Sequence, residues 1–119
     1  MTDEDVVIWY NPRCSKCRGA EDLLAAYGVS SRQLRYLEDP PPREEIVRVL
    51  GLLDATGPRE MMRTKEPRYT ELGLDGASDN ELIDAMAAHP ELIERPIVIR
   101  EDRAVIARPP ELLLSLLDR

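Results

Sequence analysis

The sequence predicts an α/β domain built on one four-stranded mixed sheet. Three observations support this class: two short strand-like segments flank an amphipathic helix near the N-terminus, a helical block fills the middle, and a hairpin and a helix follow it. The chain has 119 residues and is 43% apolar, which is enough to bury a core in one domain. We therefore expect residues 1–119 to form a single domain with a helical insertion at about 43–90.

The N-terminal third predicts a β-α-β unit. The apolar run Val6–Tyr10 is typical of a buried strand, and the turn signal Asn11-Pro12 follows it. A helix beginning near Ser15 has apolar residues at positions i, i+3, i+4 and i+7, and Gly28 is suited to end it. The segment Gln33–Leu37 then predicts a second strand.

The middle of the chain predicts helices. One helix should follow the prolines at 40–42 and end at Gly57-Pro58. Residues 59–76 are ambiguous, and we expect a short helix around Met61-Met62 and then a loop. The pair Ser78 and Glu81 has the spacing of a capping box, which predicts a helix that reaches about residue 88.

The C-terminal part predicts a β-β-α unit. Residues 97–99 and 104–107 have the composition of two strands joined by a tight polar turn. Pro109-Pro110 can then open a last helix. A β-α-β half and a β-β-α half that share one mixed sheet form the thioredoxin-like arrangement, here with helices inserted between the halves. Because fold does not determine function, the chemistry must come from particular residues.

Charge and composition argue against several classes of protein. Sixteen basic and 23 acidic residues give a net charge of −7, the wrong sign for a surface that binds a phosphate backbone. No apolar run approaches the roughly 20 residues of a membrane span. The first residues are acidic, unlike the start of a secretory signal. We expect a cytoplasmic protein that binds neither nucleic acid nor membrane directly.

Cys14 has the clearest chemical signal. It follows the strand and turn and stands at the start of the helix, with Arg13, Lys16 and Arg18 nearby. Unpaired backbone N–H groups at a helix start and nearby positive charge both favour a thiolate, so Cys14 is a candidate nucleophile. Cys17 completes a C-x-x-C motif, which indicates a thiol–disulfide pair. A zinc site needs about four ligands, and with two cysteines and one histidine we expect no metal.

Several segments, in this order along the chain, resemble the glutaredoxin-linked arsenate reductases. They are Asn11-Pro12-Arg13-Cys14-Ser15-Lys16, Tyr36-Leu37-Glu38-Asp39-Pro40-Pro41, Met62-Arg63, Glu94-Arg95-Pro96-Ile97-Val98 and Ala107-Arg108-Pro109. The resemblance covers nearly the whole chain and is specific at the level of the family.

The resemblance implies roles for these residues. Cys14 would attack arsenate to form a thiol–arsenate adduct. Three arginines would hold the oxyanion, and by matched position they are Arg63, Arg95 and Arg108. The preceding turn would support the cysteine through Asn11, Pro12 and Arg13. The bond before Pro96 would be cis and would set the Arg95 backbone against Cys14.

The chain departs from the family at two positions. Cys17 stands where the family commonly has serine or threonine, and Tyr10 stands where it often has histidine. A second thiol one helical turn from Cys14 could resolve the first adduct within the protein. The reductant therefore stays open between glutathione with glutaredoxin, another low-molecular-weight thiol, and thioredoxin. No bound cofactor is expected.

Two alternatives stay open. Spx-type regulators share this fold and a C-x-x-C redox switch, and they act by binding RNA polymerase. The Cys14-x-x-Cys17 motif fits that class better than it fits a typical reductase, whereas Arg95, Arg108 and the Tyr36-Leu37-Glu38 stretch fit the reductase better. The chain could also be another thiol–disulfide oxidoreductase.

Overall fold

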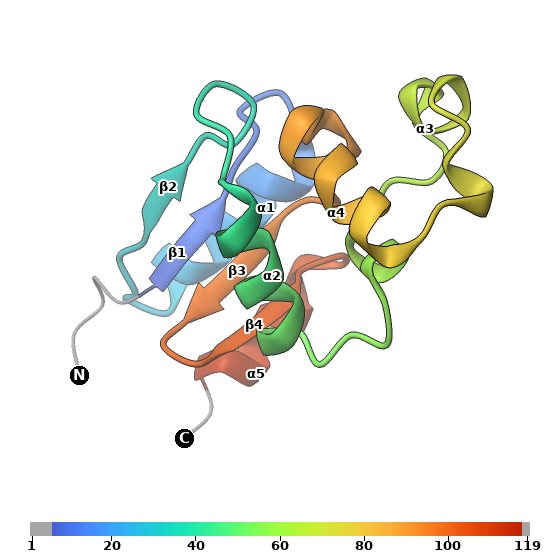
Figure 1. Cartoon of the computed structure of the whole chain (residues 1–119). Helices are drawn as coiled ribbons and strands as arrows, with labels where there is room; N and C mark the ends of the chain where they lie inside the picture. The colour runs from blue at the N-terminus through green and yellow to red at the C-terminus, as the bar shows by residue number, and fades with distance from the viewer. Residues whose placement is uncertain (1–5, 118–119) are drawn as a thin grey trace. The chain divides into compact units, whose positions relative to one another are not determined.

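The computed structural model describes residues 6–117, which Figure 1 draws in colour. The chain divides into two units. One unit contains the chain up to Asp39 and from Arg95 onward, and the other contains Pro40–Glu94. The second unit includes the helical insertion that we expected at about 43–90. That the whole chain forms a single domain stays a prediction.

The first unit is built on a four-stranded mixed sheet with the order β2-β1-β3-β4. Its strands are β1 (Val6–Trp9), β2 (Arg32–Leu34), β3 (Ile97–Arg100) and β4 (Arg103–Ile106). β1 pairs with β2 in parallel and with β3 antiparallel, and β3 and β4 form the predicted hairpin. The α/β class with a four-stranded mixed sheet is therefore confirmed.

Strand β2 ends three residues earlier than the apolar pattern predicts. The backbone N–H groups of Glu38 and Asp39 both donate to the carbonyl of Arg35, at 3.0 and 2.9 Å. These bonds turn the chain away from the sheet edge directly after Leu34. Tyr36 is still buried, so its apolar character reflects packing rather than strand pairing.

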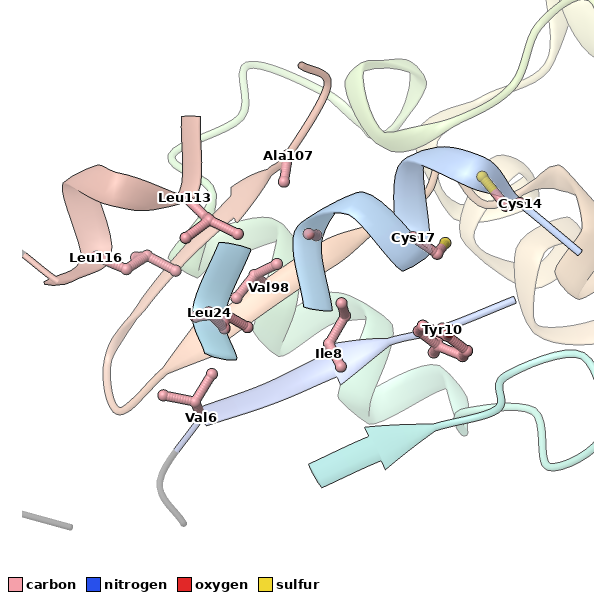
Figure 2. Close-up of a cluster of buried hydrophobic side chains, with 11 residues drawn as sticks. Val6, Ile8, Tyr10, Cys14, Cys17, Leu24, Val98, Ala107, Leu113 and Leu116 are labelled. Atoms are coloured by element: carbon pink, nitrogen blue, oxygen red, sulfur yellow. The ribbon is translucent and has the colours of Figure 1, made fainter. Parts of the chain in front are cut away.

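Helix α1 (Ser15–Ala26) packs on the sheet and shares its core. Cys17, Ala20 and Leu24 are its buried residues, and they join a cluster with side chains from β1 and β3, as Figure 2 shows. The cluster also includes Leu113 and Leu116, from the 3₁₀ turn η5 (Pro110–Leu113) and helix α5 (Leu114–Leu117). This core fixes the start of α1, where the two cysteines lie.

The second unit is helical. Its longer helices are α2 (Arg43–Leu52) and α4 (Asp79–Ala88), and they pack against each other. The predicted capping box of α4 is present: Ser78 and Glu81 each accept a hydrogen bond from the other's backbone N–H. Helix α2 ends before the predicted Gly57, because the chain leaves the helix at Leu53 and Asp54 has a positive φ of 57°.

The ambiguous segment at 59–76 holds more helix than we predicted. The 3₁₀ turn η2 (Pro58–Met61) lies close to the expected short helix, and Met62 pairs with Ile93 in an isolated bridge. The expected loop contains α3 (Pro67–Glu71) and the 3₁₀ turn η3 (Leu74–Gly76), and a third turn, η4 (Pro90–Leu92), follows α4. Arg59 ties this segment together by donating to the Tyr69 hydroxyl and to the carbonyls of Leu74 and Asp75, at 2.8, 2.8 and 2.7 Å.

Candidate active site

Cys14 lies at the N-terminal cap of α1, at the end of the turn that follows β1. Its backbone N–H donates to the Asn11 carbonyl at 2.9 Å, and its own carbonyl accepts from the Arg18 N–H at 3.2 Å. The turn is held further by the Asn11 side chain, which accepts from the Arg13 N–H at 3.0 Å. Local hydrogen bonds therefore fix the backbone that carries the sulfur.

Arg18 also holds this turn, through a contact that could not be predicted from the sequence. Its guanidinium donates to the carbonyl of Pro12 at 2.8 Å. From the sequence we expected Arg18 to contribute only positive charge, because nothing in the spacing shows which carbonyl it reaches. The turn at 11–13 is thus held by the Cys14 backbone, by the Asn11 side chain and by the Arg18 guanidinium.

The pKa of the Cys14 thiol is lowered from its usual value. Burial acts to raise this pKa, but hydrogen bonding with the Cys17 backbone, the Arg95 side chain, the Cys17 thiol and the Lys16 backbone outweighs it. The backbone N–H groups are the unpaired donors of the first helical turn, where the helix dipole also favours negative charge. Cys14 is 7% exposed, so a small part of the residue remains at the surface.

Cys17 has the opposite character. It is fully buried in the core cluster, and burial raises the pKa of its thiol to about 12. Its sulfur accepts a long hydrogen bond of 3.4 Å from the Asn11 N–H. Both cysteines are free thiols, and Figure 2 shows them one helical turn apart. The pair therefore combines one reactive sulfur with one that stays protonated at neutral pH.

The structure places Arg95 beside Cys14. Its guanidinium forms a hydrogen bond with the Cys14 sulfur, and this contact outweighs burial in raising the pKa of Arg95. Arg108 donates from Nη1 to the Arg95 carbonyl at 3.1 Å, so it lies at the same end of the sheet. The Arg95–Pro96 bond is cis, and so is Arg108–Pro109, for which we had no expectation.

Arg63 belongs to the second unit. Its backbone N–H donates to the Leu92 carbonyl at 2.7 Å, and its guanidinium pairs with Glu66 at 2.8 Å. Both groups of that ion pair are partly exposed, which leaves the guanidinium able to exchange partners at small cost. Its convergence with Cys14 on one oxyanion stays a prediction.

Tyr10 occupies the position at which the family often has histidine. Its ring is buried, and burial and the neighbouring Glu21 raise the pKa of its hydroxyl. Glu21 accepts hydrogen bonds from the Tyr10 hydroxyl and from the Gln33 amide. Tyr10 is therefore a neutral group at neutral pH, and it links β1 to α1 and β2.

A cavity of about 270 Å³ adjoins the turn that carries Cys14. Tyr10, Pro12 and Arg13 form one wall, and Arg35, Leu37 and Glu38 line it from the segment after β2. Among residues 6–117, no group of three or more histidine, cysteine or acidic side chains is placed to hold a metal ion. No helix in that range is long and apolar enough to cross a membrane.

Comparisons with known proteins relate the chain to one family. A model described as the ArsC family matches residues 9–116. An arsenate reductase from Neisseria meningitidis serogroup A is 41% identical over 115 residues, which cover 95% of this chain and 98% of that protein. An arsenate reductase from Escherichia coli is 34% identical over 115 residues, covering 95% and 81%. A solved structure of an arsenate reductase from Vibrio cholerae is 46% identical, covers 92% and 95%, and has a TM-score of 0.90. The predicted thioredoxin-like fold is thereby confirmed.

Proposed function

Because the chain belongs to the ArsC family, we propose that it is an oxidoreductase that reduces arsenate to arsenite, with Cys14 as the nucleophile. The observation that supports this most strongly is the hydrogen bond between Arg95 and the Cys14 sulfur. It sets a guanidinium beside a thiol whose pKa is lowered. A thiolate next to a cation is what attack on an oxyanion requires.

In the first step the Cys14 thiolate attacks arsenic. A sulfur–arsenic bond forms, one arsenic–oxygen bond breaks, and that oxygen leaves as water after taking up protons. Arsenic stays in the +5 state, and Cys14 holds it as a thiol–arsenate adduct. No metal ion or bound cofactor is needed for this step.

The arginines reduce the electrostatic repulsion between the Cys14 thiolate and an anionic substrate. We assign the oxyanion to Arg95, Arg108 and Arg63, because planar guanidinium groups bind oxyanions through two parallel hydrogen bonds. Arg95 already contacts the sulfur, and Arg108 contacts the Arg95 carbonyl. Arg63 must exchange Glu66 for the substrate, and the exposed character of that pair supports this exchange.

In the second step another thiolate attacks the Cys14 sulfur. A disulfide bond forms, the sulfur–arsenic bond breaks, and its electron pair passes to arsenic. Arsenic falls from +5 to +3 and leaves as arsenite. We propose Cys17 as this second thiol because it lies one helical turn from Cys14, where its effective concentration far exceeds that of a free thiol. Glutathione is the competing candidate, and it would leave a mixed disulfide on Cys14.

The resulting disulfide needs an external reductant. Thioredoxin, glutathione with glutaredoxin, or another low-molecular-weight thiol can supply the two electrons. Arsenite release should be measured with each system in turn, using wild-type protein and Cys14→Ser. The expected result is arsenite release by the wild type with one of the systems and none by the variant. Equal release by both proteins would contradict the proposal.

The regulator alternative calls for a different measurement. An Spx-type protein would bind RNA polymerase, and the Cys14–Cys17 disulfide would control that binding. Pull-down with purified RNA polymerase, in reduced and in oxidised form, tests this directly. Redox-dependent binding without arsenite release would favour the regulator over the reductase.

A further inference from the structure

We propose that the cavity beside the Cys14 turn is the docking site for the protein that reduces the oxidised chain. Its predicted occupant is an acidic side chain of that protein, flanked by an apolar one. The proposal rests on the proposed function in one respect, which is that turnover leaves Cys14 in a disulfide. The proposed arsenate steps assign no role to Arg35, Leu37 or Glu38, which line this cavity.

The cavity lies next to the turn that carries Cys14, which a reducing protein has to approach. Pro12 and Arg13 form part of its wall, and Arg13 directly precedes Cys14 in the chain. The opposite wall comes from Arg35, Leu37 and Glu38, beyond the end of β2. A protein segment anchored here therefore lies against the turn that carries the reactive sulfur.

The charges on the wall are available to a ligand. Within residues 6–117, Arg13, Arg35 and Glu38 take part in no ion pair, and Arg35 has only two long side-chain hydrogen bonds of 3.4 Å to Gln33. Two guanidinium groups and one carboxylate make the wall net positive, in a chain whose net charge is −7. A carboxylate from a partner can bridge the two arginines through charge-assisted hydrogen bonds.

An apolar surface lies beside those charges. Leu37 is 42% exposed, and the buried Tyr10 ring and Pro12 complete the apolar part of the wall. Aromatic and arginine side chains in a small recess are typical of the residues that dominate binding energy at protein interfaces. The combination suits an acidic residue next to an aliphatic or aromatic one.

The direction of the Cys14 sulfur favours a protein over a small thiol as the occupant. Figure 2 shows the Cys14 sulfur pointing away from Tyr10. A small thiol seated against Tyr10 would not face that sulfur, whereas a protein can fill the cavity with one side chain and present its cysteine from elsewhere.

The docked reaction is a thiol–disulfide exchange. A partner thiolate attacks the Cys14 sulfur, and the Cys14–Cys17 bond breaks with its electron pair on Cys17, which takes up a proton. A second partner thiolate then attacks the partner sulfur of this mixed disulfide, and Cys14 leaves as a thiolate. Two electrons pass from the partner dithiol to the chain, and the partner becomes a disulfide.

The test measures reduction of the oxidised chain without arsenate. The chain is oxidised with diamide, and the second-order rate constant of its reduction is determined with thioredoxin, with glutaredoxin, and with the neutral dithiol dithiothreitol. The variants are Arg35→Glu, Leu37→Ser and Glu38→Gln. The matched control is Arg32→Glu, which reverses the same charge as Arg35→Glu on an exposed residue of β2 outside the cavity.

We expect Arg35→Glu to lower the rate constant with the effective protein reductant at least tenfold, and Arg32→Glu to lower it less than twofold. Leu37→Ser should lower it at least threefold, and Glu38→Gln should raise it, because the wall becomes more positive. Rates with dithiothreitol should stay within twofold throughout. Added salt should slow the wild type more than Arg35→Glu.

Three results would overturn the docking site. The first is an equal rate constant for Arg35→Glu and Arg32→Glu with the protein reductant. The second is a fall in the rate constant of Arg35→Glu with dithiothreitol that matches its fall with the protein reductant. The third is that neither thioredoxin nor glutaredoxin reduces the wild type faster than dithiothreitol at equal thiol concentration. The proposed function fails by a different measurement, namely the absence of arsenite release by the wild type with every reductant system. The two failures are therefore distinguishable.

Discussion

Alkylation at pH 7 should modify Cys14 long before Cys17, because iodoacetamide reacts with thiolates. Burial raises the pKa of Cys17 to about 12. At pH 7 such a thiol is ionised in about one molecule in 10⁵. The pKa of Cys14 is lowered from a usual value of 9.0. Even at that usual value about one thiol in 100 would be ionised, so the thiolate population favours Cys14 by more than about 10³-fold.

The rate ratio is smaller than the population ratio. A less basic thiolate is a weaker nucleophile, with a Brønsted coefficient of about 0.4–0.5. That correction leaves a preference of at least roughly 30-fold for Cys14 from ionisation alone. Accessibility adds to it, because Cys14 is 7% exposed and Cys17 is fully buried. We therefore expect Cys14 to be fully labelled while Cys17 is still unmodified.

The assay is quenched alkylation followed by peptide mass spectrometry across a pH series. A lowered pKa means that the thiolate is already present below the usual titration range, so the labelling rate of Cys14 should reach half its maximum below pH 9. Arg95→Met removes the hydrogen bond to the sulfur and should move this midpoint upward. Circular dichroism checks that the variant is folded.

Two outcomes would refute this reasoning. Labelling of Cys17 at a rate comparable to that of Cys14 would show that the roles of the two thiols are reversed. An unchanged midpoint in Arg95→Met would show that Arg95 does not stabilise the thiolate, and the main support for the oxyanion site would then be lost.

The remaining predictions concern the redox route, the anion site and the fold. Cys17→Ser should lose turnover with thioredoxin selectively, and mass spectrometry should trap a Cys14–Cys17 disulfide in the wild type; a Cys14–glutathione adduct alone would exclude the internal route. Arg108→Ala should raise the KM for arsenate at least tenfold while the labelling rate of Cys14 changes little. Arg59→Ala should lower the free energy of unfolding by about 2 kcal/mol in urea titrations, because the guanidinium loses its hydrogen bonds to Tyr69, Leu74 and Asp75, two of which are partly buried. Ser78→Ala should cost about 1 kcal/mol in the same titrations, by removing a helix cap.

The elements predicted well are those whose signals are local. Strand β1 and the β3–β4 hairpin follow from short β-branched runs next to turn residues, and both lie in the buried sheet. Helix α4 follows from Ser78 and Glu81, whose side chains form the reciprocal cap that the spacing predicted. In each case the residues that define the element lie within it or beside it.

The elements predicted poorly depend on contacts that sequence spacing does not show. Strand β2 stops where two backbone N–H groups turn back to the Arg35 carbonyl. The segment that holds α3 is held by Arg59, whose partners lie 10–16 residues further along the chain. Neither the choice of carbonyl nor the reach of a guanidinium can be read from apolar periodicity.

The residues of the candidate site also differ in whether a local sequence pattern predicts them. Cys14 could be proposed as the nucleophile from its neighbours alone, because a cysteine at a helix start among basic residues is a local pattern. Arg95 and Arg108 required the family resemblance, since 81 residues separate Arg95 from Cys14 in sequence although the structure joins them. The approach of Arg63 to the same anion stays a prediction that rests on the resemblance.

The two cysteines lie in the same helical turn, yet the pKa of Cys14 is lowered and that of Cys17 is raised. The causes of these shifts suggest the order in which the two thiols ionise. Burial is the largest reason that the Cys17 pKa is raised, and the Cys14 sulfur adds to it through its charge and its hydrogen bond. In the mechanism that we propose, Cys14 bonded to arsenic would no longer carry that charge on its sulfur, and the negative charge would lie on the arsenate oxygens. The barrier to ionising Cys17 would then fall at the stage when a second thiolate is required. Protonated Cys17 in the resting protein and activated Cys17 in the adduct would therefore follow from the same contact.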